Sequence, residues 1–337
     1  MKKLIQKKIP LIYLIVLVAI SCGITYMAMQ INFDTQNKKS TELTENINSC
    51  NTKVIRLEGY QLIKPLMFVD SDCEGANLIS TKQSIEQLIQ NYKTLQGVST
   101  ASVYLRDYSN SEWININENE KFDPGSLFKV PILMAYLKMN ELSPGVLNKE
   151  ILYNQPFAIN KEVVYKSKTI QLGKKYKVKE LLRYMIEYSD NNATALLSNN
   201  IKPEVFIKLF TDLDMKAPVF DAQQYLISAK QYSYFMRAIY NASYLSIEDS
   251  EYAAELLSKT EFKDGILKAL PKDIKVVHKF GESGTPADRQ LHESAIVYLN
   301  GKSYLITVMT KGKDIKVLSN LMSDISQLVY DKMVTNS

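Results

Sequence analysis

The hydrophobic positions of the chain begin as one continuous run. Residues 1–8 are basic, and residues 9–29 follow without a single charged side chain. A run of that length is enough to span a bilayer as a helix, and the lysines before it favour a cytosolic N-terminus. We therefore expect a single-pass signal anchor in the cell membrane, with the rest of the chain outside the cytosol. A cleaved signal peptide is the alternative, and Cys22 has a partial resemblance to a lipoprotein processing site.

A polar segment separates this run from the rest of the chain. Residues 30–55 keep neither a helical nor a strand period for long, which is typical of a partly disordered stalk. The periods return further on, and we expect one globular domain over residues 56–337. Cys50 and Cys73 fall on the outer side of the anchor. An oxidising compartment allows a disulfide between them, and two free thiols are the alternative.

In the globular part, strand-like alternation occurs at both ends and helical spacing in the middle. A helix begins near residue 80, and two alternating runs follow it as a hairpin. Residues 145–270 read mostly as amphipathic helices. The strand-like runs are 98–106, 111–117, 276–280, 294–299 and 304–309, and a last helix covers 314–333. This order predicts an α+β fold, in which one antiparallel sheet is flanked by helices and joined by an all-helical lobe.

Charge and composition exclude several classes of function. The four lysines of residues 1–8 supply most of the formal net charge of +5. About +1 is left for the remainder, which gives no case for a nucleic-acid partner. No cluster of cysteines and histidines has metal-ligand spacing, so we expect neither a metal nor another cofactor. His278 and His292 fall in strand-like runs and are expected to be structural, and the chain is expected to be a monomer.

A possible nucleophile stands where a short loop enters an apolar helix, in residues 122–133. Ser126 and Lys129 are three residues apart, so they share one face of the helix. A serine needs a neighbouring base to become a nucleophile. A lysine amine can be that base if burial or a nearby positive charge lowers its pKa, and Lys129 lies in an apolar run. Taken alone, this pair is better explained as a helix cap followed by a surface lysine.

Two further motifs follow in order, and together the three change the interpretation. They are Ser126-Leu127-Phe128-Lys129, Ser189-Asp190-Asn191 and Lys279-Phe280-Gly281. The set resembles the S-x-x-K, S-D-N and K-T-G motifs of class A β-lactamases and penicillin-binding proteins. The resemblance covers about residues 80–335 and implies a β-lactamase/transpeptidase-like fold. It also implies a bacterial cell envelope as the location.

The resemblance implies acyl transfer through a covalent acyl-enzyme. Ser126 would attack the carbonyl of a β-lactam or a D-Ala-D-Ala-like peptide, and Lys129 would take or relay its proton. Ser189 would hand a proton to the leaving nitrogen. Asn191 would hold the substrate's amide, and Lys279 would supply positive charge near the substrate carboxylate.

The third motif would complete the substrate-binding edge. The oxyanion hole would use the N–H of Ser126 and a second N–H near Glu282 or Ser283, and we include Gly281 and Ser283 among the substrate-binding residues.

The third motif also departs from the family, because Phe280 stands where the family has a hydroxyl residue. That hydroxyl would contact the substrate carboxylate. Ser283 or Thr285 could substitute for it, and Arg289 could pair with the carboxylate.

The loop between the helices that end near Leu213 and begin near Ser228 departs as well. Class A β-lactamases hold the deacylating water there with a glutamate, whereas residues 214–227 contain none. Asp221 is the only carboxylate in the middle of this loop, and its shorter side chain would misplace the base. We therefore expect acylation by β-lactams with slow turnover. The alternatives are a β-lactamase with another water-activating group, a D-Ala-D-Ala peptidase, and an extracellular binding module with eroded catalysis.

Overall fold

The computed structural model describes residues 54–69, 74–157, 163–219 and 225–335, with residues 23, 25–27, 29 and 30 near the N-terminus. The chain divides into residues 1–49 and 50–337, and every element below belongs to the second part. Among the residues described, no helix is long and apolar enough to cross a membrane. Most of the predicted anchor and stalk lies outside the described residues, as do Cys22, Cys50, Cys73 and Asp221.

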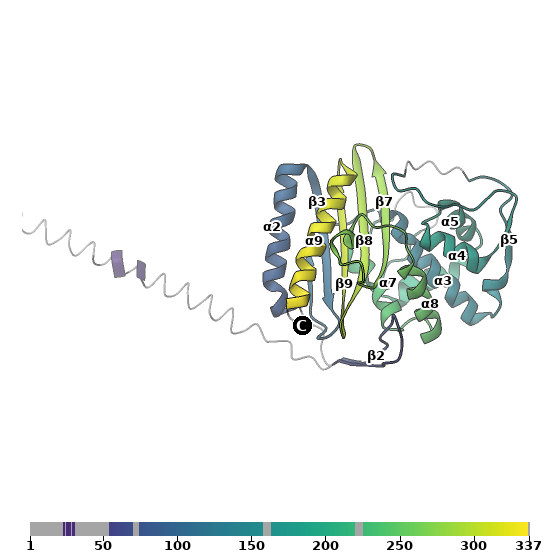
Figure 1. Ribbon diagram of the computed structural model, residues 1–337, viewed down its shortest axis with the longest axis horizontal. Coiled ribbons are helices and arrows are strands. Elements are labelled where there is room, and N and C mark those ends of the chain that lie inside the picture. The colour runs from purple at the N-terminus through teal and green to yellow at the C-terminus, as the bar shows by residue number, and fades with distance from the viewer. Residues whose placement is uncertain are drawn as a thin grey trace, which may run out of the picture. The chain divides into compact units, whose positions relative to one another are not determined.

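A five-stranded antiparallel sheet occupies the centre, with strands in the order β4-β3-β9-β8-β7 (Figure 1). Its strands are β3 (Val98–Asp107), β4 (Trp113–Ile116), β7 (Val276–Thr285), β8 (Asp288–Leu299) and β9 (Lys302–Gly312). Strands from the two ends of the globular sequence therefore meet in one sheet, and the predicted α+β class is confirmed. Strand β7 lies at one edge of the sheet.

The β7–β8 hairpin is longer than the sequence predicts. Pairing continues from Val276–Val297 to Thr285–Asp288, whereas the predicted runs cover only 276–280 and 294–299. The intervening residues include Gly281, Gly284 and several polar side chains, and these hide the alternation. The missed part of β7 begins at Gly281, directly after the predicted Lys279 and Phe280.

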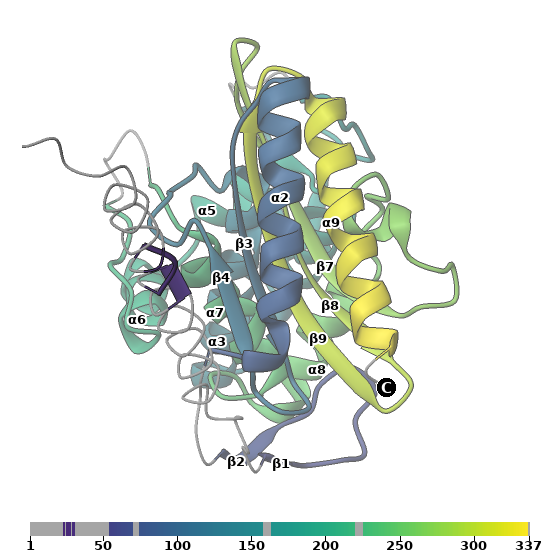
Figure 2. The same cartoon turned by 90° about the vertical axis from the view of Figure 1, so that its left-hand side faces the viewer.

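Helices α2 (Ile79–Gln96) and α9 (Ile315–Thr335) lie side by side on one face of the sheet (Figure 2). Ile85, Ile89 and Tyr92 of α2 are buried at helical spacing, as the pattern predicts. The Tyr92 hydroxyl donates to an Asp324 carboxylate oxygen of α9 at 2.5 Å. This layer covers the sheet away from the three motifs.

The predicted helical lobe packs on the other side. Its helices are α3 (Lys129–Leu142), α4 (Val178–Glu187), α5 (Asn191–Ser198), α6 (Pro203–Asp212), α7 (Ala229–Tyr240) and α8 (Ile247–Ser258). Helix α3 is buried all round from Lys129 to Leu137, as expected of a central helix. A small ribbon, β5 (Glu150–Leu152) with β6 (Lys175–Lys177), interrupts the region predicted as helical. Three residues per strand are too few to show a period.

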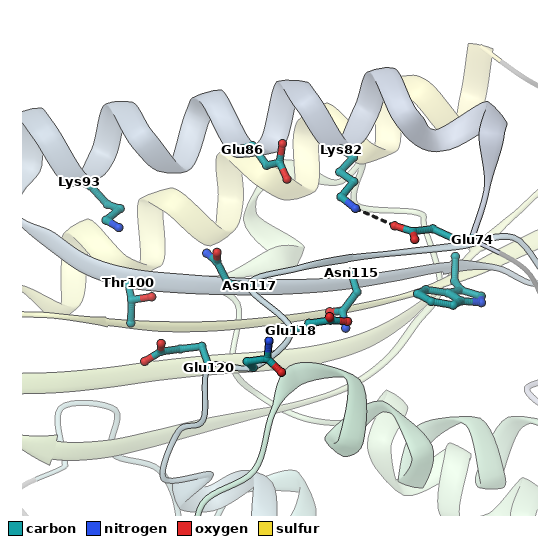
Figure 3. Close-up of a pocket in the computed structure, with 11 residues that line it drawn as sticks. Glu74, Lys82, Glu86, Lys93, Thr100, Asn115, Asn117, Glu118 and Glu120 are labelled. Atoms are coloured by element: carbon teal, nitrogen blue, oxygen red, sulfur yellow. Dashed lines mark hydrogen bonds and ion pairs between the residues drawn. The ribbon is translucent and has the colours of Figure 1, made fainter. Parts of the chain in front are cut away.

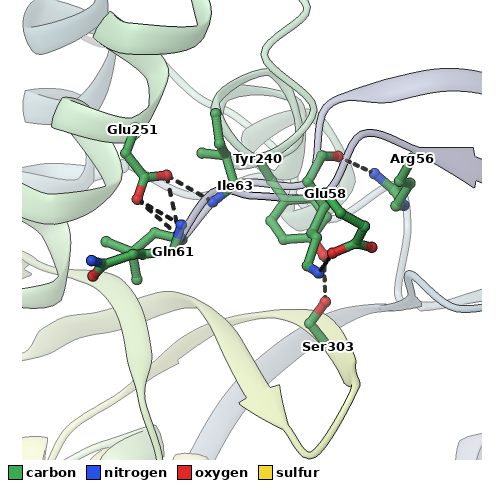
Figure 4. Close-up of polar contacts among 9 residues, drawn as sticks. Arg56, Glu58, Gln61, Ile63, Tyr240, Glu251 and Ser303 are labelled. Atoms are coloured by element: carbon green, nitrogen blue, oxygen red, sulfur yellow. Dashed lines mark hydrogen bonds and ion pairs between the residues drawn. The ribbon is translucent and has the colours of Figure 1, made fainter.

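The first described segment of the domain is fastened to the lobe. Strands β1 (Val54–Arg56) and β2 (Leu66–Val69) pair antiparallel. Between them, the backbone N–H groups of residues 61–63 donate to the Glu251 carboxylate of α8 (Figure 4). The Arg56 guanidinium lies 5.1 Å from the ring centroids of both Tyr108 and Tyr240. Residues 54–69 are therefore an integral part of the fold.

Candidate active site

Ser126 lies in the short 3-10 turn η2 (Gly125–Phe128), which runs directly into α3. Lys129 is the first residue of α3 and is 3 % exposed. Its Nζ donates to Ser126 Oγ at 2.9 Å. The spacing of three residues thus places the amine on the hydroxyl, at the head of a helix whose other side chains are mostly apolar.

The second motif, residues 189–191, contacts the same Lys129 amine. Lys129 Nζ lies within hydrogen-bond distance of Ser189 O (2.5 Å), Ser189 Oγ (3.0 Å) and Asn191 Oδ1 (2.8 Å). Ser189 has φ +53°, a left-handed conformation that costs a residue other than glycine on the order of 1 kcal/mol. Asp190 fixes this turn, because its side chain caps α5 by accepting from Asn192 N.

Lys279 of the third motif completes the cluster from the edge strand β7. It is 0 % exposed, and its Nζ donates to Ser189 Oγ at 3.0 Å and to Phe280 O at 3.1 Å. Burial lowers the pKa of Lys279 well below its usual range, and the positive charge of Lys129 lowers it further, whereas Glu293 opposes the shift. Ser189 Oγ therefore lies between two lysine amines, one of which also contacts Ser126.

Two glycines allow β7 to lie against the nucleophile's turn. A Cβ on Gly281 would lie 2.4 Å from Pro124 O and 2.8 Å from Leu127 N. Gly125 has φ +51°, and a Cβ there would lie 2.3 Å from Glu282 O. Gly281, predicted to bind substrate, is thus a packing residue in this structure, and it sets the approach of β7 to η2.

Ser126 opens into a cavity of about 290 Å³. Ser189 and Asn191 also line it, together with Phe280, Glu282, Val163 and residues 165–169. The structure thus brings Ser126, Lys129, Ser189, Asn191 and Lys279 together through hydrogen bonds, and both lysines are buried.

The structure does not bring Ser283 to this cavity. Its hydroxyl donates to Asp123 Oδ2, so the sequence-based expectation of a substrate contact finds no support in its position. Thr285 and Arg289 lie at the far end of the β7–β8 hairpin and do not line the cavity either. None of the three proposed substitutes for the missing hydroxyl is therefore in place.

Phe280, which replaces that hydroxyl residue, belongs to an aromatic cluster. Its ring stacks on Phe262 at a centroid distance of 4.2 Å and meets the edge of Tyr165 at 5.8 Å. Lys279 Nζ lies 4.3 Å from the centroid of the Phe280 ring. At 7 % exposure most of the ring is packed, although the residue also lines the cavity at Ser126.

The loop after α6 is hydrogen-bonded to the segment that precedes Ser126. Ile227 and Phe122 exchange two backbone hydrogen bonds of 3.0 Å. Asp214 in this loop is exposed and does not line the cavity. Because Asp221 lies outside the described residues, its role as a base stays a prediction.

Among the residues described, Asp190 and Glu282 are the carboxylates that line the cavity. Asp190 accepts from Thr169 Oγ1 (2.7 Å) and Ile170 N (2.9 Å) in addition to its helix cap. Glu282 accepts from the backbone N–H groups of Val164 and Tyr165. Sequence reasoning missed both roles, since segment 163–169 has no motif and its partners are far away in the sequence.

The two histidines lie in the sheet behind the site, where they have structural partners. His278 Nδ1 bonds a Glu293 carboxylate oxygen at 2.7 Å. His292 Nδ1 accepts from Thr310 N at 3.1 Å, and its Nε2 lies 3.0 Å from Asp123 O. Burial lowers the pKa of His292 to about 4.

The shifted pKa of His292 predicts acid sensitivity of the fold. In the unfolded chain the His292 imidazole binds a proton near pH 6.5, whereas in the folded chain it binds one only near pH 4. Stability from this group is therefore full above pH 6.5 and is lost as the pH falls towards 4, by up to about 3 kcal/mol. Denaturant unfolding between pH 7 and pH 4 should show a correspondingly weaker pH dependence in His292→Gln. Equal pH dependence in both proteins would contradict the assignment.

A larger pocket, of about 600 Å³, lies elsewhere in the domain, along α2 and β4 (Figure 3). It is polar, and a Lys82–Glu74 ion pair of 2.7 Å crosses one part of it. No residue of the three motifs lines it. Size alone therefore does not identify the reactive site, which is the smaller cavity at Ser126.

A serine–lysine pair at the head of a central helix, beside the edge of a five-stranded sheet, defines a serine hydrolase of the β-lactamase type. Residues 80–333 match the family model described as the β-lactamase enzyme family, Beta-lactamase2. The chain therefore belongs to this family, and the resemblance seen in the sequence is confirmed.

Solved structures share the fold at low sequence identity. PBP-A has 19% identity and a TM-score of 0.65, over 79% of this chain and 99% of that one. A β-lactamase from Chitinophaga pinensis DSM 2588 has 21% identity and a TM-score of 0.65, over 75% and 99%. A β-lactamase from Francisella tularensis has 17% identity and a TM-score of 0.62, over 76% and 100%. A comparison with curated proteins finds no match.

Proposed function

We propose that this protein is a serine hydrolase that β-lactams acylate at Ser126 and that releases the acyl group slowly. The observation that carries the proposal is the position of Lys129 Nζ, 2.9 Å from Ser126 Oγ and 3.0 Å from Ser189 Oγ. The Lys129 amine can thereby take a proton from Ser126 and pass one to Ser189, the residue that faces the leaving group. Side chains that touch in this order form a path for general acid–base catalysis.

In the proposed reaction, Ser126 Oγ attacks the lactam carbonyl while its proton passes to a neutral Lys129 amine. The contact between Lys129 Nζ and Ser126 Oγ places this amine to take the proton. As the carbon–nitrogen bond breaks, Ser189 gives its proton to the leaving nitrogen and is reprotonated by Lys129. The product is an ester on Ser126, with the lactam nitrogen protonated.

Two further groups would hold the substrate. Asn191 Oδ1 accepts a hydrogen bond from Lys129, so its Nδ2 is the part that remains to donate to a substrate carbonyl. The oxyanion would be held by the N–H of Ser126 and by an N–H of β7 near Glu282, because Gly125 and Gly281 bring these two backbones together.

Slow release of the acyl group follows from the surroundings of Ser126. Hydrolysis of the ester needs a base that holds water, and both carboxylates that line the described cavity already accept backbone N–H groups. The loop that holds a glutamate in class A enzymes has none here. A variant of PBP-A has been solved as its acyl-enzyme complex with penicillin G, which shows that the related fold can hold such an ester.

The proposal extends to the location and the partners. The apolar run 9–29 and the family favour a membrane anchor in a bacterial envelope, with the hydrolase outside the cytosol. The substrate would be a β-lactam or a D-Ala-D-Ala-like peptide. The protein would act as a monomer, without nucleic acid or cofactor.

The test is an intact-mass time course of the full-length protein in detergent, mixed with benzylpenicillin, with Ser126→Ala as the control. We expect an adduct of one penicillin that lasts for hours in the wild type and is absent in the control. Drug consumption without a lasting adduct would mean efficient hydrolysis by another base. Neither adduct nor consumption would favour a binding module and reject the proposal.

A further inference from the structure

Segment 163–169 lies along one side of the cavity that contains Ser126, and we call it the strap. It belongs to the connection between β5 and β6, in the helical lobe. Val163 and residues 165–169 line the same cavity as Ser126, although they are distant from it in the sequence. The strap contacts β7 through a hydrogen bond from Val164 to Glu282.

One attachment of the strap is to the edge strand. The backbone N–H of Val164 donates to Glu282 Oε1 at 2.8 Å, and the N–H of Tyr165 donates to Glu282 Oε2 at 3.4 Å. The Tyr165 ring also packs edge-on against Phe262 and Phe280. A single carboxylate of β7 thus holds two successive backbone groups of the strap.

The other attachments are on the lobe side. Ser167 Oγ donates to Glu261 Oε2 at 2.6 Å, and Lys168 Nζ lies 3.6 Å from Glu261 Oε1. Thr169 Oγ1 donates to Asp190 Oδ1 at 2.7 Å, next to the Ser189 turn. The strap therefore joins the second and third motifs across the cavity, and Glu282 supplies its hydrogen bonds on the β7 side.

The cavity is small, so the position of the strap affects which substrates can reach Ser126. Pockets for drug-sized ligands usually measure about 300–1,000 Å³, and this cavity, at about 290 Å³, lies at the lower limit. A substrate needs room for the reacting carbonyl at Ser126 and for whatever the acyl group carries beyond it. The strap occupies space on that side, and its outer surface is exposed, with Val164 46 % exposed.

We propose that Glu282 is a specificity-determining residue that latches the strap across the cavity and restricts the site to acyl donors with small side chains. The proposal rests on the proposed function, because it concerns what reaches Ser126. The carboxylate acts by position: when it is removed, the strap loses both N–H bonds to β7 and the cavity widens. The acylation rate then rises more for large acyl donors than for small ones.

The experiment compares two penicillins that share one nucleus, 6-aminopenicillanic acid and a penicillin with a fluorophore on its acyl side chain. Second-order rate constants for acylation are measured by intact mass on the full-length protein. We expect Glu282→Ala to raise the ratio of the large-probe rate to the small-probe rate at least fivefold. The comparison of ratios cancels intrinsic reactivity and any effect of the substitution on the oxyanion hole.

A second variant breaks the same contact from the other side. Val164→Pro removes the N–H that donates to Glu282 and leaves β7 untouched. It should shift the ratio in the same direction. Glu86→Ala, on the exposed side of α2, is the matched control and should leave the ratio unchanged. Ratios within twofold of the wild type in both strap variants would overturn the proposal.

Trypsin supplies a readout that needs no acylation, because the strap carries the exposed Lys166 and Lys168. Cleavage there should be at least fivefold faster in Glu282→Ala than in the wild type and the Glu86→Ala control. Unchanged cleavage would overturn the latch whatever the penicillins do. Faster cleavage in a protein that no penicillin acylates would retain the latch as a contact, overturn its role in acyl-donor selection, and reject the proposed function.

Discussion

Replacement of Lys129 by methionine is expected to slow acylation of Ser126 by benzylpenicillin at least about a thousandfold, within the range for a positioned general base. Methionine keeps much of the length of the side chain but has no amine to take the Ser126 proton. It also removes the group within hydrogen-bond distance of both Ser126 Oγ and Ser189 Oγ, so the proton path to the leaving nitrogen is cut. The rate is read from the growth of the adduct by intact mass.

The matched control is Lys138→Met on the same helix, whose amine bonds Glu141 at 2.5 Å, away from the motifs. This variant should acylate at the wild-type rate. Circular dichroism of both variants separates lost chemistry from lost fold. If folded Lys129→Met acylates within tenfold of the wild type, another group takes the proton and the assignment of Lys129 is wrong.

The sequence predicted those parts of the site that depend on short spacings and on element type. Ser126 and Lys129 meet because three residues of a helical turn separate them, which is a local relation. Strands at both ends of the globular sequence indicated the sheet that brings Lys279 to the lobe. The convergence of the three motifs follows from this topology, and the family resemblance had already implied it.

The parts that sequence could not supply are non-local. Nothing in the neighbourhood of Glu282 indicates that its carboxylate binds the backbone of residues 164–165, more than a hundred positions earlier. Ser283 was expected to contact the substrate, but its hydroxyl bonds Asp123. The sequence did not show the direction of this side chain, because glycines and polar residues hide the strand alternation. Side-chain direction on β7 depends on pairing with β8, which only the structure gives.

Gly281 illustrates the same limit, because it matters through its close contact with η2, which is distant in the sequence. Gly281→Ala is expected to destabilise the fold by about 1–3 kcal/mol, the usual cost of an overpacked contact, and to slow acylation about a hundredfold. The added Cβ would lie 2.4 Å from Pro124 O, 2.8 Å from Leu127 N and 2.9 Å from Leu127 Cγ, so β7 and η2 must separate. Such a displacement moves both oxyanion donors relative to Ser126 Oγ, and misplacement by about 1 Å costs about a hundredfold in rate.

Chemical denaturation and the acylation rate are both measured, since the two effects have one cause. Gly301→Ala, in the β8–β9 turn, is the comparison: no atom lies within 4 Å of its added Cβ, but its φ of +75° makes alanine unfavourable. It should lose about 1–2 kcal/mol of stability and acylate normally, because its strain is local and remote from η2. Loss of rate in Gly281→Ala alone would show that the close approach of β7 sets the geometry at Ser126. Equal rates in the two variants would mean that the site tolerates a displaced edge strand, and that the oxyanion is held elsewhere.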